Sequence, residues 1–141
     1  MDILRLVDSL VRKYNTRNPF EIINNLNVIV VFYPLKGVKG FYQYFQRNNI
    51  IYIDNEISEN EQKVVCAHEL GHMFLHKKCN AIFMDTRTHF VTNKYENEAN
   101  TFAAELLIPD SIILENPGMT KNQIARLTGY DEKIMEFKHY N

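Results

Sequence analysis

The segment CAHELGHMFLHKK, residues 66–78, carries three histidines at intervals of four residues, with a glutamate beside the first. Residues four apart in a helix lie on the same face, one turn apart, so His68 and His72 project toward a common point. Two imidazoles placed in this way can both reach one metal ion at about 2.0–2.1 Å. The spacing therefore predicts a metal site on one side of this helix.

Glu69 belongs to the same HExxH pattern but is suited to a different role. Its carboxylate leaves the helix beside the two histidines and cannot reach the point where they meet. It can accept a hydrogen bond from a metal-bound water and take the proton of that water, as a general base does. Because HExxH also arises by chance among ordinary helix residues, a further ligand is needed to support this interpretation.

His76 continues the histidine stripe but lies too far along the helix to bind the same ion. Its Cα is about 12 Å from that of His68 along the axis, at 1.5 Å per residue. The longer pattern HExxHxxGxxH also fails, because Leu75 and Lys78 stand where its glycine and third histidine belong. We therefore expect His76 to support a ligand or to pack beside one, and the third ligand to come from elsewhere.

The segment ENEAN, residues 96–100, is the best source of a third ligand. Glu96 and Asn100 lie one turn apart on one helix face, whereas Glu98 points about 160° away. We expect Glu96 to bind the ion and Asn100 to accept a hydrogen bond from a ligand histidine. Glu98 is the alternative ligand, and two ordinary solvated carboxylates are the remaining interpretation. A site of this composition suits zinc and also accepts manganese or iron.

Capping and periodicity predict the two helices that position these residues. Ser58 and Glu61 form a capping box that opens the histidine helix. This helix is apolar nearly all round apart from its polar stripe, as a buried helix is. Residues 94–109 form the second helix, which ends at Pro109 and whose alanines allow close approach to the first. The segment between them, 79–93, has no clear period and is expected to be a loop.

The rest of the chain predicts helices around a small sheet, in the order helices, strands, helices, which is typical of an α+β fold. The expected elements are helices at 2–15 and 18–26, a strand at 28–34, a hairpin of strands 41–46 and 50–54 around the turn 47–49, and two helices between 120 and 138, the first opened by a capping box of Thr120 and Gln123.

The composition is that of one soluble globular domain. The chain has 141 residues, of which 45% are hydrophobic and 23% are charged, with a net charge of −1. No strong field therefore draws it to nucleic acid or to an anionic membrane. Residues 1–14 interleave charged with apolar side chains, unlike a signal peptide or a membrane span. Cys66 and Cys79 make no disulfide framework, and we interpret them as reduced thiols in a cytoplasmic protein.

Taken together, HELGHMFLH (68–76) and ENEANTFAAELLIP (96–109) resemble the ImmA/IrrE-type metallopeptidases, which are relatives of the gluzincins. The match is close over the two motif helices and extends over residues 60–110 in general. The resemblance implies a single zincin-like domain over residues 1–141, with a small antiparallel-rich sheet and a helical C-terminus. It also implies a zinc-dependent endopeptidase that binds one Zn²⁺ per chain.

Carried over residue by residue, the resemblance makes His68 and His72 metal ligands and Glu69 the base. In gluzincins the third ligand heads an ExxxD pattern, which maps here to Glu96, with Asn100 in place of the aspartate. That substitution leaves a neutral group beside the ligands, which weakens their basicity.

Members of the family often act on a repressor of a mobile element or stress regulon, so the resemblance implies a helix-turn-helix repressor as the protein substrate. The alternative is a zinc-containing interaction module that binds such a repressor without cleaving it. We expect no direct contact with nucleic acid, because the recognition-helix candidate at 131–138 carries three acidic residues.

Two further features could serve an extended peptide. One face of the 41–54 hairpin can lie along a substrate that pairs with a strand edge, although plain solvent-facing tyrosines explain the sequence equally well. Arg87 and His89 fall in the expected loop, where either can stabilise an oxyanion or be merely solvated.

Overall fold

The structure is a computed structural model that describes residues 2–76 and 89–139, with the side chains described from residue 93 onward in the second range. Its elements are α1 (Ile3–Tyr14), α2 (Pro19–Asn24), β1 (Val28–Tyr33), β2 (Gly40–Phe45), β3 (Asn48–Asp54), α3 (Glu59–His76), α5 (His89–Leu107), α6 (Asp110–Glu115), α7 (Lys121–Thr128) and the 3₁₀ helix η1 (Glu132–Phe137). The expected α+β class is confirmed.

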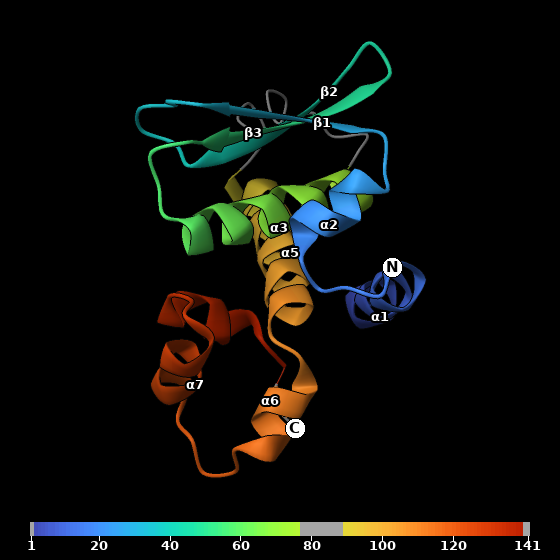
Figure 1. The fold of residues 1–141 in the computed structure, drawn as a ribbon. Coiled ribbons are helices and arrows are strands. Elements are labelled where there is room, and N and C mark those ends of the chain that lie inside the picture. The colour runs from blue at the N-terminus through green and yellow to red at the C-terminus, as the bar shows by residue number, and fades with distance from the viewer. Residues whose placement is uncertain (1, 77–88, 140–141) are drawn as a thin grey trace.

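The strands of the described residues form one sheet above α3, with β3 in the centre (Figure 1). β2 pairs with β3 antiparallel, as expected for a hairpin, and β1 pairs with β3 parallel. The sheet is therefore mixed rather than antiparallel-rich. The parallel pairing arises because the chain leaves β1 and returns as β2 on the far side of β3.

The hairpin turn lies one position earlier than the sequence suggests. Gln46 and Arg47 have positive φ values of 49° and 65°, and the first paired residues are Phe45 and Asn48. Two consecutive residues with positive φ match the twist of the flanking strands. The buried pair Tyr42 and Ile51 fixes this register, because a shift by one residue would turn both side chains to the other face. Core packing thus outweighs the preference of asparagine for positive φ.

Helices α3 and α5 pack directly against each other beneath the sheet, and small residues make this possible (Figure 1). A Cβ at Gly71 would lie 3.1 Å from the side chain of Phe102, which is fully buried. Ala103 and Ala104 of α5 are also buried. This close packing places the polar stripe of α3 next to α5. α5 begins at His89, earlier than expected, while most of the expected loop lies outside the described residues.

The C-terminal helices follow the predicted signals. Thr120 and Gln123 form the expected capping box of α7, and Gly129 ends that helix with a positive φ. η1 is joined to α5 by Lys138, whose ammonium group donates a 2.6 Å hydrogen bond to the Glu105 carboxylate; both side chains are buried. Within the described residues, no helix is both long and apolar enough to cross a membrane.

Candidate metal centre

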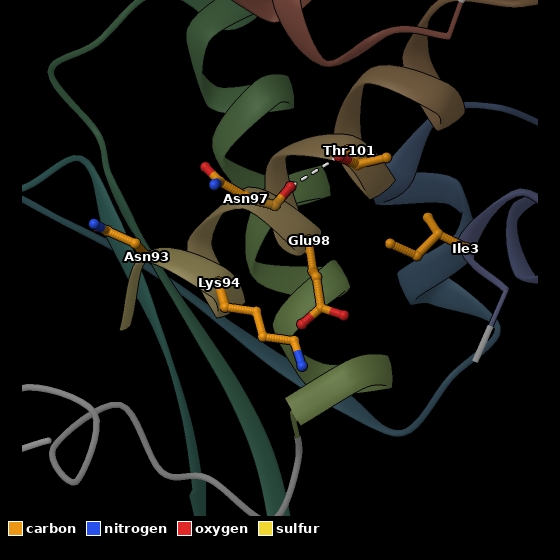
Figure 2. A pocket seen from close by; sticks show the side chains of 6 residues that line it. All are labelled: Ile3, Asn93, Lys94, Asn97, Glu98 and Thr101. Atoms are coloured by element: carbon orange, nitrogen blue, oxygen red, sulfur yellow. Dashed lines mark hydrogen bonds between the residues drawn. The ribbon is translucent and has the colours of Figure 1, made fainter. Parts of the chain in front are cut away.

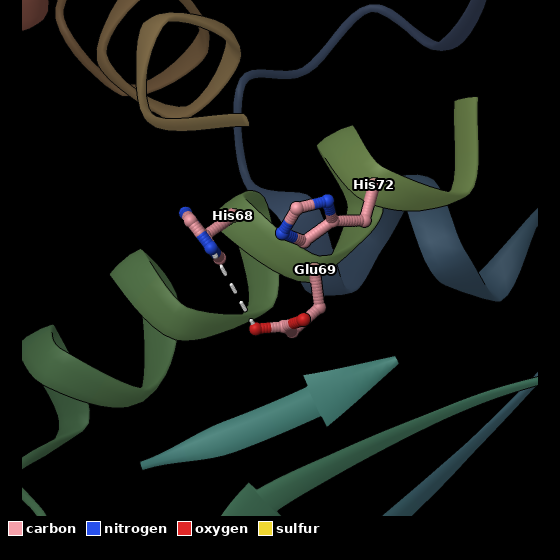
Figure 3. Close-up of side chains that lie close together, drawn as sticks. All are labelled: His68, Glu69 and His72. Carbon is pink, nitrogen blue, oxygen red and sulfur yellow. Dashed lines mark ion pairs between the residues drawn. The ribbon is translucent and has the colours of Figure 1, made fainter. Parts of the chain in front are cut away.

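His68, Glu69 and His72 project from the buried middle of α3 and converge (Figure 3). One ligand atom from each residue can be chosen so that all three atoms lie within 4.8 Å of one another. His72 and Glu69 are buried, and His68 is half-buried. The one-turn spacing of HExxH thus brings the side chains of His68 and His72 together on one side of α3.

Glu96 of α5 completes this group. Its Oε2 atom lies 2.9 Å from Nε2 of His68, and its Oε1 atom lies 3.0 Å from Nε2 of His72. Ligand atoms that surround a tetrahedral ion at about 2.0–2.1 Å are about 3.3–3.4 Å apart. The two distances between histidine and carboxylate are slightly shorter than this, so a zinc-sized ion would need a small outward shift of these side chains.

Asn100 lies one turn after Glu96, and its side chain is hydrogen-bonded to His68. Both residues of the predicted Glu-x-x-x-Asn unit thus face the motif helix. His68 is thus hydrogen-bonded both to the Glu96 carboxylate and to the Asn100 side chain.

Burial raises the pKa of Glu69, and the nearby charge of Glu96 acts in the same direction. The charges of His68 and His72 and a hydrogen bond from the backbone N–H of Tyr42 oppose this shift without cancelling it. A carboxylate with a raised pKa is a stronger base than one in water, which suits proton abstraction near neutral pH.

His68 and Glu96 shift each other's pKa values in opposite directions. Burial lowers the pKa of His68, but the hydrogen bond from His68 to Glu96 and the charges of Glu69 and Glu96 outweigh burial and raise it. Burial raises the pKa of Glu96, but its hydrogen bonds to both histidines lower it well below the usual range. A metal ion that binds to His68 would therefore compete with a proton for this nitrogen.

His76 and Glu98 form a second contact beside the centre. Nδ1 of His76 lies 2.9 Å from Nδ1 of His72, and its Nε2 lies 3.1 Å from Oε1 of Glu98. Its ring centroid is 4.3 Å from that of Tyr95. Burial lowers the pKa of His76, although its hydrogen bond to Glu98 acts in the opposite direction.

The contact between His76 and Glu98 is not predicted from the sequence, in which Glu98 is an alternative ligand beside His68 and His72. The structure brings Glu98 to His76 instead. The signal was the third histidine of the stripe, which needs a polar partner of its own once it is buried.

Among Cys66, Cys79, Arg87 and His89, only Cys66 has a side chain that the structure describes. Cys66 is fully buried in the core, as its helix position predicts, and burial raises the pKa of its thiol. Arg87, Cys79 and the side chain of His89 lie outside the described residues.

Comparison with known proteins adds an independent finding. Residues 23–138 match the family described as IrrE N-terminal-like domain, Peptidase_M78. The chain is 41% identical to Uncharacterized immunity region protein 2 of Bacillus phage phi105 over 135 residues, which cover 94% of this chain and 85% of that protein. It is 28% identical to Metallopeptidase ImmA of Bacillus subtilis (strain 168) over 136 residues, which cover 94% of this chain and 80% of that protein.

Proposed function

Because the chain belongs to the IrrE N-terminal-like family of peptidases, we propose that it is a zinc-dependent endopeptidase that cleaves a DNA-binding repressor. The observation that carries the proposal is the position of the Glu96 carboxylate, within 3.0 Å of Nε2 of both His68 and His72. The proposal takes residues 1–141 as one domain and places the protein in the cytoplasm, where a repressor acts.

His68, His72 and Glu96 would hold one Zn²⁺ per chain, since nitrogen and carboxylate oxygen are ligands that zinc prefers. When bound, the ion supplies a Lewis acid for the scissile carbonyl and lowers the pKa of its water. The hydrogen bond from His68 to Asn100 would hold that ring in place while Nε2 faces the ion. The neutral amide replaces the carboxylate that gluzincins have in this position.

Glu69 is the group that would move protons. Its burial and raised pKa favour uptake of a proton from the water, and the same carboxyl group can return that proton to the leaving amine. The backbone N–H of Tyr42 holds the carboxylate and thereby fixes its direction relative to the histidines.

Two surfaces beside the centre suit an extended peptide. β2 is an edge strand among the strands that the structure describes, so its outer backbone groups can pair with a substrate strand. A cavity of about 410 Å³ is lined by Asn100, Val64 and Ala103, together with Tyr130 and Phe137 from the C-terminal region. Its mixed apolar and polar wall would take a substrate side chain close to His68.

The choice of a repressor as the substrate rests on similarity to known proteins. One relative is named an immunity region protein of a phage and another a metallopeptidase. The resemblance to the ImmA/IrrE-type metallopeptidases, whose members often act on a repressor, supports the same substrate class here. We therefore name a helix-turn-helix repressor encoded beside this chain as the substrate to test.

The test combines metal analysis with cleavage. Purified protein should carry about one zinc per chain, and His68→Ala or His72→Ala should lose it. Glu69→Gln should keep zinc and fold but cut the repressor about 10²–10⁴-fold more slowly, because the amide cannot take the proton. Repressor fragments analysed by mass spectrometry provide the measurement.

The alternative from another class is a zinc-containing module that binds the repressor without cleaving it. It predicts that Glu69→Gln relieves repression as well as the wild type does, with the repressor intact. Full metal occupancy in both histidine variants would overturn the metal site itself.

A further inference from the structure

A continuous line of polar contacts runs from the candidate metal centre to the surface. Nδ1 of His72 lies 2.9 Å from Nδ1 of His76, and Nε2 of His76 lies 3.1 Å from Oε1 of Glu98. His72 and His76 come from consecutive turns of α3, whereas Glu98 comes from α5. The line therefore joins the two helices that supply the proposed ligands.

The direction of these hydrogen bonds follows from the ligand role of His72. If Nε2 of His72 binds the ion, Nδ1 carries the proton and donates it. Nδ1 of His76 must then be the acceptor, so the proton of His76 sits on Nε2. That N–H points at the Glu98 carboxylate. An ionised carboxylate has no proton to donate, so it acts as the acceptor. One tautomer assignment satisfies every contact in the line.

The surroundings of His76 restrict the orientation of its ring. The residue is 5% exposed, each of its ring nitrogens has a polar neighbour, and its ring packs against Tyr95. Turning the ring over would put a ring carbon in the place of each nitrogen, so that His72 would lose its acceptor and Glu98 would lose its donor. The surroundings thus hold the ring in the orientation that suits His72.

Glu98 is the accessible end of the line. It lines a surface pocket of about 500 Å³ together with Ile3, Asn93, Lys94, Asn97 and Thr101 (Figure 2). Its side chain is 33% exposed. A substitution of Glu98 therefore leaves no closed cavity in the core, so its effect on the metal centre can be separated from an effect on packing.

We propose that His76 and Glu98 are positioning residues that fix the tautomer and ring orientation of His72 for metal binding. The inference rests on the proposed function for the ligand role of His72. It assigns a carboxylate to each side of the centre: Glu96 contacts the ion directly, and Glu98 acts through His76. His68 is thus supported by the neutral side chain of Asn100, whereas His72 is supported by the Glu98 carboxylate through His76.

The first test measures zinc affinity by competition with a chelator of known affinity. Glu98→Ala should weaken zinc binding about 10–100-fold, the usual cost of losing a partner of a ligand histidine. Glu98→Gln should recover most of the affinity, because its amide oxygen can still accept from Nε2 of His76. Glu115→Ala, which removes an exposed carboxylate far along the chain, is the control and should bind zinc as the wild type does.

The second test reads the tautomer directly. Long-range ¹H–¹⁵N NMR of zinc-loaded, ¹⁵N-labelled protein should show His76 with its proton on Nε2 and none on Nδ1. In Glu98→Ala this preference should weaken, because the Nε2 proton loses its acceptor while the contact with His72 remains. A proton on Nδ1 of His76 in the wild type would overturn the proposal.

The outcomes separate this inference from the proposed function. If the wild type binds no zinc, the metal centre itself is wrong. If Glu98→Ala binds zinc as tightly as the wild type, the centre stands and the positioning role is wrong. Thermal melts of the metal-free variants test whether the contact between His76 and Glu98 only stabilises the fold. In that case Glu98→Ala would lower the melting temperature without metal and leave the zinc affinity unchanged, which would also overturn the proposal.

Discussion

At the scale of single residues, the two glutamates near the start of the described part of α5 make different contacts although they are two positions apart. Glu96 contacts His68 and His72, whereas Glu98 contacts His76. Loss of a direct ligand removes one of the few bonds that hold the ion. Loss of an indirect partner changes only how well a ligand is oriented.

We therefore expect Glu96→Ala to weaken zinc binding much more than Glu98→Ala does. Glu96→Ala should also lower the melting temperature measured with zinc present, because metal binding contributes to folding free energy. Zinc titrations and thermal melts of the two variants, run in parallel, provide the measurement. If Glu98→Ala is the variant with the larger loss, Glu96 is not the ligand.

The sequence predicts which residues form the centre better than it predicts how they are supported. Helical periodicity predicts the faces of His68, His72 and Glu96, which lie close together in the structure, because each face is set within a single helix. The contact between His76 and Glu98 depends on how α5 crosses α3, which no single-helix argument contains. Side-chain length matters as well, since the carboxylate of Glu98 reaches a histidine from the flank of its helix.

At the scale of elements, the fit between β2 and α3 holds Glu69. Gly40 begins β2, and a Cβ there would lie 2.4 Å from Cγ1 of Val65 and 2.6 Å from the backbone oxygen of Tyr52. Two residues later, the N–H of Tyr42 donates to Glu69. A shift of this strand would therefore reach the proposed base.

We expect Gly40→Ala to destabilise the protein by about 1–3 kcal/mol, because neither the strand backbone nor the helix can yield without cost. The cost of this clash exceeds the gain in stability of about 0.5–1 kcal/mol that comes from replacing a glycine inside a strand. Val38→Ala, at an exposed neighbouring position, should change stability by less than about 0.5 kcal/mol. Urea melts of both variants measure the difference, and equal stabilities would contradict the expected clash.

The sequence predicts local elements well and non-local pairing poorly. Caps and periodicity indicate α1, α2, α3 and α7 because those signals lie within each helix. The parallel pairing of β1 with β3 has no local signal, since it depends on the path that the chain takes around the sheet.

At the scale of the whole molecule, both ends of the chain are joined to α5. The guanidinium of Arg17 donates to the backbone oxygens of Glu105 and Leu106, and Lys138 pairs with the Glu105 side chain. The helix that carries Glu96 is therefore held at its far end by N-terminal and C-terminal segments. Stability of the fold and geometry of the centre are thus coupled through α5.

The stability of the metal-free protein depends on pH through His68. Its pKa is raised in the folded state, so the folded protein holds this proton more tightly than the unfolded chain does. The stabilisation is fully present below the ordinary histidine pKa of about 6.5 and is lost as the pH rises through the folded value. Glu96, whose pKa is lowered, loses its contribution only in acid, below its ordinary value.

His76 acts in the opposite direction in the same range, because its pKa is lowered. A comparison with His68→Gln cancels that contribution and isolates His68. We expect the melting temperature of metal-free wild type to exceed that of metal-free His68→Gln at pH 6 and the difference to shrink by pH 8. With zinc present the trend should reverse, because the ion displaces the proton and binds more tightly as the pH rises. A difference that does not change with pH in the metal-free pair would show that His68 holds no extra proton in the folded protein.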